Sequence, residues 1–88
     1  MPTISMFYGI IIRMYNESGE RHHVPHIHCV FNEYEAVLDF DGNVLEGNIP
    51  SNKLKLVIAW IELHRDELSA NWQLLSNGEK HFQIAPLQ

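Results

Sequence analysis

The chain has only one cysteine, no long hydrophobic run and no basic segment at its start, and each absence excludes a class of protein. A single cysteine, Cys29, excludes an intramolecular disulfide framework and any zinc site built from several cysteines. The longest apolar stretch, around residues 57–61, is far shorter than the roughly 20 residues needed to cross a bilayer. Since no basic segment precedes an apolar run at the N-terminus, we expect no signal peptide, no membrane partner and a cytoplasmic location.

Basic residues are also scarce. Lysine and arginine number 6 against 11 acidic residues, which gives a formal net charge of −5. Broad binding to nucleic acid depends on basic side chains that contact phosphate, so the charge does not favour nucleic acid as a partner. The 88 residues, 45% of them hydrophobic and 19% charged, are typical of one small folded domain that spans residues 1–88.

The first half of the chain has the residue types of β-strands. Residues 4–15 are rich in β-branched and aromatic side chains and are apolar at both odd and even positions. This pattern predicts a single strand that is covered on both faces and bent at Gly9. Turn-forming residues begin at Asn16, and we expect the loop to run to Pro25.

A two-residue turn at Asn32-Glu33 predicts a hairpin with two distinct faces. One face would be apolar and would hold Ile27, Cys29, Phe31, Tyr34, Ala36 and Leu38. The other would hold His26, His28 and Val30 on one strand and Glu35, Val37 and Asp39 on its neighbour, with His26 directly opposite Asp39. A shift of one residue at the turn would change every facing pair.

Asp41-Gly42 predicts the turn of a second hairpin. In this register Leu45 lies opposite Leu38 on the apolar face, and Glu46 lies opposite Val37 on the polar face.

Helical spacing dominates the second half. Ser51 is the expected N-cap, and Asn77-Gly78 is a typical helix end. The apolar positions at helical spacing are Leu54, Val57, Ile58, Ile61, Leu68, Trp72 and Leu75. One continuous helix would be about 39 Å long, whereas a domain of this size is roughly 25 Å across. We therefore expect a break near His64, and a short edge strand at residues 81–84.

These elements predict an α+β fold, in which an antiparallel sheet of three or four strands packs against one long or broken helix. The residues expected in or beside the core are Ile27, Cys29, Leu38, Phe40, Ile58, Ile61, Leu68 and Trp72.

Histidine supplies the main chemical signal, because four of the 6 histidines lie within residues 22–28. His26 and His28 alternate around Ile27, so both rings would leave the same face of a strand. With a carboxylate from Asp39 or Glu35 across the hairpin, they are candidate ligands of a divalent metal. The structural alternative is a solvent-facing sheet surface, on which His–Asp pairs are ordinary.

His64 belongs to a second candidate site. It lies one helical turn after Trp60, and Asn71 lies two turns further along the same side, so the three could form a polar-aromatic groove. Alternatively, Trp60 and Trp72 are packing residues of the core, and His64 lies at its edge and bonds to a residue nearby in the chain. A nucleophile–base pair of Cys29 with His28 is disfavoured, because adjacent strand residues point to opposite faces.

Several segments spread over nearly the whole chain carry a family resemblance. They are Pro2-Thr3-Ile4-Ser5, Phe7, Gly9-Ile10, Pro25-His26-Ile27-His28, Tyr34-Glu35-Ala36, Leu45-Glu46-Gly47, and Trp60, Glu62, Leu63, His64, Arg65, Glu67, Leu68, Asn71 and Trp72. In this order they resemble the small bacterial family named domain of unknown function 4160. His22-His23-Val24 departs from the family pattern, which lowers the functional weight of His22 and His23.

The resemblance implies a paired-gene, toxin–antitoxin-like system, because members are often encoded next to another small protein. It therefore favours a non-catalytic regulatory or interaction module that binds a small partner protein. The alternative hypothesis is a small phosphodiesterase or nuclease. There His26 and His28 would act as general base and acid or as metal ligands, and Arg13 or Arg21 would neutralise phosphate charge.

Overall fold

The structure is a computed structural model that describes residues 2–15 and 24–88. Most of the loop expected after Tyr15, with Arg21, His22 and His23, lies outside the described residues. The elements in chain order are β1 (Thr3–Phe7), β2 (Ile10–Arg13), β3 (His26–Phe31), β4 (Tyr34–Asp39), β5 (Val44–Asn48), α1 (Ser51–Leu63) and α2 (Arg65–Ser76).

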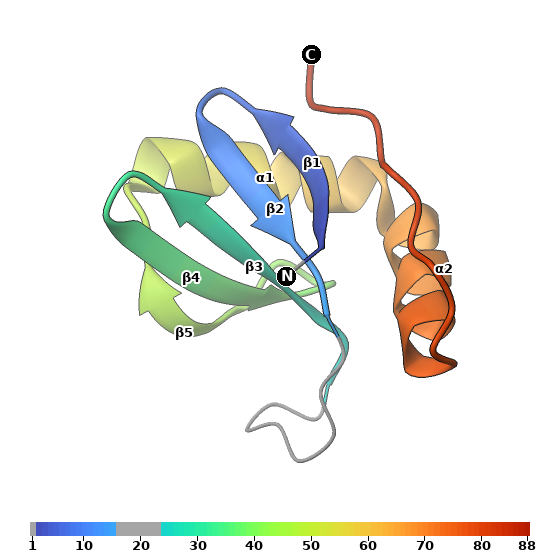
Figure 1. Ribbon diagram of the computed structural model, residues 1–88. Helices are drawn as coiled ribbons and strands as arrows, with labels where there is room; N and C mark the ends of the chain where they lie inside the picture. Colours follow the sequence, from blue (N-terminus) through green and yellow to red (C-terminus); the bar gives the residue numbers. More distant parts are fainter. Residues whose placement is uncertain (1, 16–23) are drawn as a thin grey trace.

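The five strands form one antiparallel sheet in the order β1-β2-β3-β4-β5. Helix α1 lies across one face of this sheet, and α2 follows it at a large angle beside the end of the sheet (Figure 1). The α+β prediction is confirmed, with five strands in place of three or four and with the predicted helical segment broken into two helices.

The extra strand comes from residues 4–15, where the prediction of one bent strand was wrong. Tyr8 and Gly9 have φ angles of 50° and 79°, and they form a two-residue turn that pairs Phe7 with Ile10. Two left-handed residues in succession produce the tight turn that joins twisted antiparallel strands. Because the turn holds two residues, the inward-facing positions change from odd at Phe7 to even at Ile10 and Ile12. The register shift between Thr3 and Ser5 accompanies a buried residue at an even position, Ile4, in β1 as well.

The register of the β3–β4 hairpin is confirmed in full, from His26 opposite Asp39 to Phe31 opposite Tyr34. In the next hairpin Glu46 pairs with Val37 as predicted, but Leu38 pairs with Val44 instead of Leu45. The ladder shifts between Val37 and Leu38, because a bulge adds one residue to β5.

The helical segment is broken at His64, as expected from its length. Helix α1 ends at Leu63 and α2 begins at Arg65, so the longest dimension of the molecule is only 34 Å. The expected N-cap at Ser51 was displaced by one residue, since Pro50 occupies the cap position and no side chain caps the helix. At the end of α2, Gly78 has a φ of 74° and terminates the helix as predicted.

The core lies between α1 and the sheet face that it covers. Its buried members are Ile4, Phe7, Ile10, Ile12, Met14, Ile27, Cys29, Ala36, Leu38, Ile49, Val57, Trp60, Ile61, Leu68 and Ile84. Two predicted members, Phe40 and Trp72, pack against it while partly buried. Ile58 was wrongly placed in the core; its side chain lies over Gly42 at the rim and is 37% exposed.

The last ten residues have no regular secondary structure, so the expected edge strand at 81–84 does not form. Instead, the Ile84 backbone N–H donates to the Ile4 carbonyl at 2.8 Å, and the Ile84 side chain enters the core. This segment runs beside α2 and past the end of α1 (Figure 1). Among the described residues, neither helix has the length and apolar character to cross a membrane.

Candidate functional site

His26 and His28 project from the same face of β3, as their alternation predicted, and their rings lie 5.4 Å apart between centroids. The expectation that this face is open to solvent was wrong at both positions. His26 is fully buried and His28 is 8% exposed. Two segments far away in the sequence cover them.

Helix α2 covers His26. The centroid of the Trp72 ring lies 5.1 Å from that of the His26 ring and 6.2 Å from that of the Phe40 ring. The His26 Nδ1 lies 2.7 Å from the Val24 carbonyl oxygen. Since a carbonyl only accepts hydrogen bonds, Nδ1 carries the proton and donates it. His26 is therefore a packed residue that anchors the start of β3, and its removal would open a cavity beside Trp72.

Tyr15 covers His28. The Tyr15 ring stacks on the imidazole at a centroid distance of 4.7 Å, with an interplanar angle of 17°. The Glu35 carboxylate lies on the neighbouring strand, 3.5 Å from the His28 Nδ1. The predicted approach of a carboxylate to the histidine pair is thus found at Glu35.

Asp39 faces His26 in the ladder, but its carboxylate turns toward the β4–β5 turn. It accepts hydrogen bonds from the backbone N–H groups of Asp41 and Asn43 and from the Asn43 side chain, at 2.9–3.0 Å. Burial alone would raise the pKa of Asp39, but these donors outweigh it and lower the pKa. Within the described ranges no group of three or more histidine, cysteine or acidic side chains is arranged to hold a metal ion.

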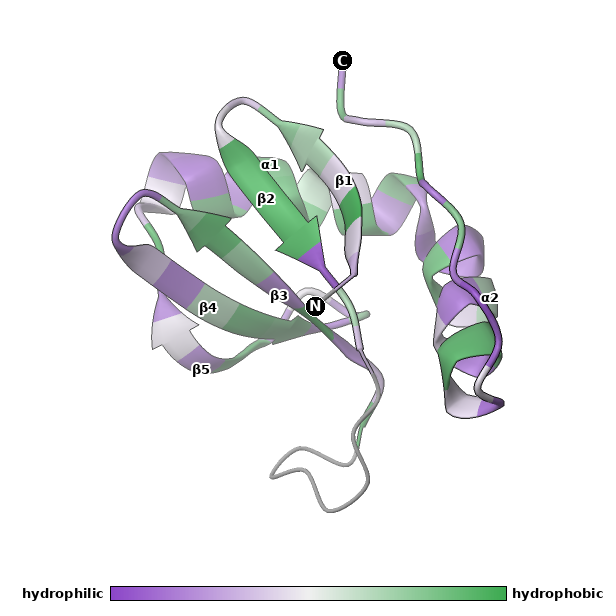
Figure 2. Ribbon diagram, in the orientation of Figure 1, coloured by the Kyte–Doolittle hydropathy of each residue, from purple (hydrophilic) through white to green (hydrophobic). Residues whose placement is uncertain are grey.

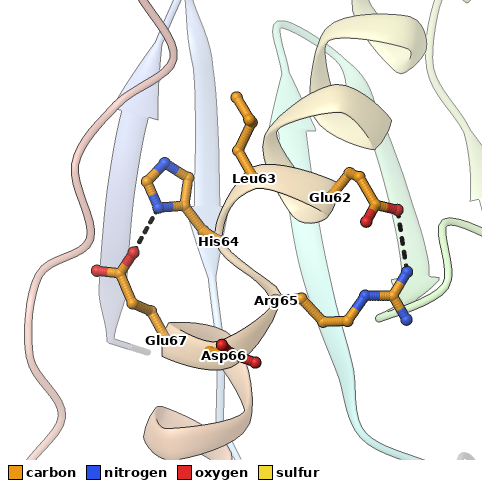
Figure 3. A pocket seen from close by; sticks show the side chains of 6 residues that line it. All are labelled: Glu62, Leu63, His64, Arg65, Asp66 and Glu67. Atoms are coloured by element: carbon orange, nitrogen blue, oxygen red, sulfur yellow. Dashed lines mark hydrogen bonds and ion pairs between the residues drawn. The ribbon is translucent and has the colours of Figure 1, made fainter.

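An open pocket of about 490 Å³ lies at the junction of α1 and α2, and Figure 3 shows the side chains that line it. Residues 62–67 line it: Glu62, Leu63, His64, Arg65, Asp66 and Glu67. The His64 Nδ1 lies 2.5 Å from the Glu67 carboxylate, and the ring also contacts Trp60 at 5.5 Å. On the other side Arg65 binds Glu62 at 3.1 Å and Asp41 of the β4–β5 turn at 2.6 Å. The sequence did not predict the ion pair of Arg65 with Asp41, because the two residues are 24 positions apart.

Asn71 does not join the predicted groove with Trp60 and His64. Its amide is fully buried and makes two hydrogen bonds with the backbone of Phe82, at 2.8 and 2.9 Å. The indole N–H of Trp60, also fully buried, donates to the Ala85 carbonyl at 2.8 Å. Both side chains therefore hold the C-terminal segment, and the packing alternative is the correct one for Trp60.

Cys29 is buried on the α1 side of the sheet, on the face opposite His28, so the two side chains diverge as expected. Burial raises the pKa of its thiol to about 11. At pH 8 only about one thiol in a thousand is then the reactive thiolate.

We expect Cys29 to resist a thiol-specific reagent at pH 8 in the native state, because the thiol is both buried and protonated. The same reagent should modify it at the rate of a model peptide once guanidinium chloride unfolds the chain. Mass spectrometry of the adduct measures both rates. Native-state modification as fast as that of the peptide would contradict this prediction.

The structure defines a class: a small α+β domain with a five-stranded antiparallel sheet, one helix across the sheet, and a buried histidine pair that the second helix and Tyr15 cover. The family pattern of the domain of unknown function DUF4160 matches residues 9–73, which is most of the chain. The chain therefore belongs to this family. No curated protein and no solved structure was found to match it.

Proposed function

We propose that the protein is a non-catalytic interaction module, and that a small partner protein adds an extended segment to the outer edge of β5. The observation that carries the proposal is the exposure of this strand. It is last in the sheet order, so among the described strands β4 alone pairs with it, and four of its five residues are exposed. Addition of a strand to such an edge is a common mode of protein recognition, in which backbone hydrogen bonds supply much of the affinity.

The opposite edge of the sheet is partly occupied by the chain itself. The Gln83 side chain donates to the Thr3 carbonyl at 2.7 Å, and the Ile84 N–H donates to Ile4. These bonds place the C-terminal segment along β1. The two edges therefore differ, and β5 is the more accessible one.

Charge around β5 indicates the chemistry of the partner. Exposed carboxylates surround the β4–β5 hairpin and the turn before it: Glu33, Glu35, Asp41 and Glu46. Figure 2 shows hydrophilic and hydrophobic residues mixed in β5 and the adjoining part of β4, whereas β2 is mainly hydrophobic. The segment that binds here would accordingly carry lysine or arginine, since complementary charge accelerates association and selects partners.

The paired-gene arrangement implied by the family resemblance supplies a defined partner to test. The protein would be produced together with the product of the adjacent gene, and their affinity measured by calorimetry. We expect a complex in which the amides of β5 exchange hydrogen more slowly than in the free protein. Glu33→Lys and Glu46→Lys should each weaken it about tenfold or more, most strongly at low salt.

Glu79→Lys is the matched control, because Glu79 is an exposed acidic residue in the C-terminal segment, away from β5. It changes the net charge by the same amount and should leave the affinity within about twofold. A complex that leaves β5 exchange unchanged, or the failure of the folded chain to bind the adjacent gene product, would refute the proposal.

A further inference from the structure

Arg13 ends β2 on the sheet face opposite α1, and its side chain has an unusual environment. The Nε–H group is buried and has no hydrogen-bond acceptor among the described residues. The other partly buried arginine, Arg65, forms ion pairs with Asp41 and Glu62. Buried polar groups in native proteins are nearly always hydrogen-bonded, so a buried Nε–H without an acceptor among the described residues makes Arg13 a candidate ligand-binding residue.

The neighbours of Arg13 define one side of the site. Thr3 lies opposite it on β1, and His28 lies opposite it on β3, so the three side chains share the same sheet face. His28 is held under Tyr15, and its Nδ1 faces Glu35. The ladder therefore places His28 on the strand next to Arg13, at the paired position.

The nearest strand that carries an acidic side chain on this face is β4. Glu35 pairs with Val30 there, so its backbone lies two strands from Arg13, or about 10 Å at the usual strand spacing, and its carboxylate reaches His28 on the strand between them. Among the described residues no carboxylate forms an ion pair with Arg13, although acidic residues outnumber basic ones. Within residues 2–15 and 24–88 the guanidinium therefore has no acidic partner.

We propose that Arg13, with His28 beside it, binds a small oxyanion, a carboxylate or a phosphate. The planar guanidinium presents parallel N–H donors that match both groups in a bidentate arrangement. The net charge of −5 favours a small anion over a polyanion, because long-range repulsion grows with the charge of the ligand. This inference goes beyond the proposed function and does not rest on it.

The test uses the whole chain and the side-chain Nε–H signal of Arg13 in a nitrogen–proton NMR spectrum. Inorganic phosphate and sodium acetate are titrated separately, and sodium chloride at equal ionic strength serves as the reference. We expect a saturable shift of the Arg13 signal with at least one oxyanion, while the Arg65 signal stays in place. The stronger of the two titrations identifies the ligand class.

Variants separate specific binding from general charge effects. Arg13→Gln should abolish the saturable response, measured through the backbone amides of Thr3 and His28. Arg13→Lys keeps the positive charge but loses the parallel N–H donors of the guanidinium, and it should bind the oxyanion about tenfold more weakly. Arg65→Gln is the control and should bind like the unaltered protein. The proposal fails if chloride produces the same shift as the oxyanions, or if Arg13→Gln retains the response.

Discussion

Replacing Gly47 with alanine is expected to destabilise the fold by about 2–5 kcal/mol. A Cβ atom at this position would lie 2.2 Å from the backbone carbonyl oxygen of Glu35, and the backbone φ of 77° is unfavourable for any residue with a Cβ. The left-handed conformation costs roughly 1–2 kcal/mol, and a forced shift of packed backbone costs roughly 1–3 kcal/mol. Denaturation by urea, followed by circular dichroism, measures the change in free energy of unfolding.

Gly78→Ala is the matched control for this substitution. Gly78 has nearly the same φ, 74°, but nothing lies within 4 Å of the Cβ that alanine would add. Only the conformational cost remains, so the loss should be about 1–2 kcal/mol. Equal losses in the two variants would show that the close approach of β4 to Gly47 has no energetic consequence.

Truncation of Ile61 to alanine is expected to cost about 2–5 kcal/mol, because it removes three buried methyl or methylene groups and leaves a cavity. Ile61 is 1% exposed and lies in the core between α1 and the sheet. In a domain whose total stability is of the order of 5–15 kcal/mol, this loss would shift the midpoint of unfolding strongly.

Ile58→Ala makes the same chemical change three residues earlier on the same helix. The Ile58 side chain is 37% exposed and lies over Gly42, so less of its surface leaves water when the chain folds. We expect a loss of about 1 kcal/mol or less. The midpoint temperatures of thermal unfolding of the two variants, measured under identical conditions, test this difference. Equal midpoints would contradict the assignment of Ile61 to the core.

The parts of the fold predicted correctly are those fixed by short-range chemistry. Asn32, with a φ of 53°, makes the turn that sets the β3–β4 register. Gly78 ends α2 for the same conformational reason. The hairpin at Tyr8-Gly9 was missed because a tyrosine in the left-handed region is uncommon, so the sequence resembled one continuous strand.

Side-chain surroundings were harder to predict than backbone structure. Alternation placed His26 and His28 on one face, but the cover over His26 comes from Trp72, which is 46 positions away. The bulge in β5 likewise has no signal in the residues themselves. The carboxylate of Asp39 was expected to lie near a histidine. It instead accepts hydrogen bonds from backbone N–H groups of the adjoining β4–β5 turn.

The bonds of Trp60 and Asn71 to the C-terminal segment make the cooperative folding unit longer than the stretch that sequence similarity recognises. The family match ends at residue 73, inside α2, and begins after β1. A chain cut at those limits would remove the buried Ile84 side chain from the core and would leave the Asn71 amide and the Trp60 indole N–H without their hydrogen-bond partners. For this chain the folded unit therefore extends outside the matched region, by one strand at the start and about ten residues beyond the last helix.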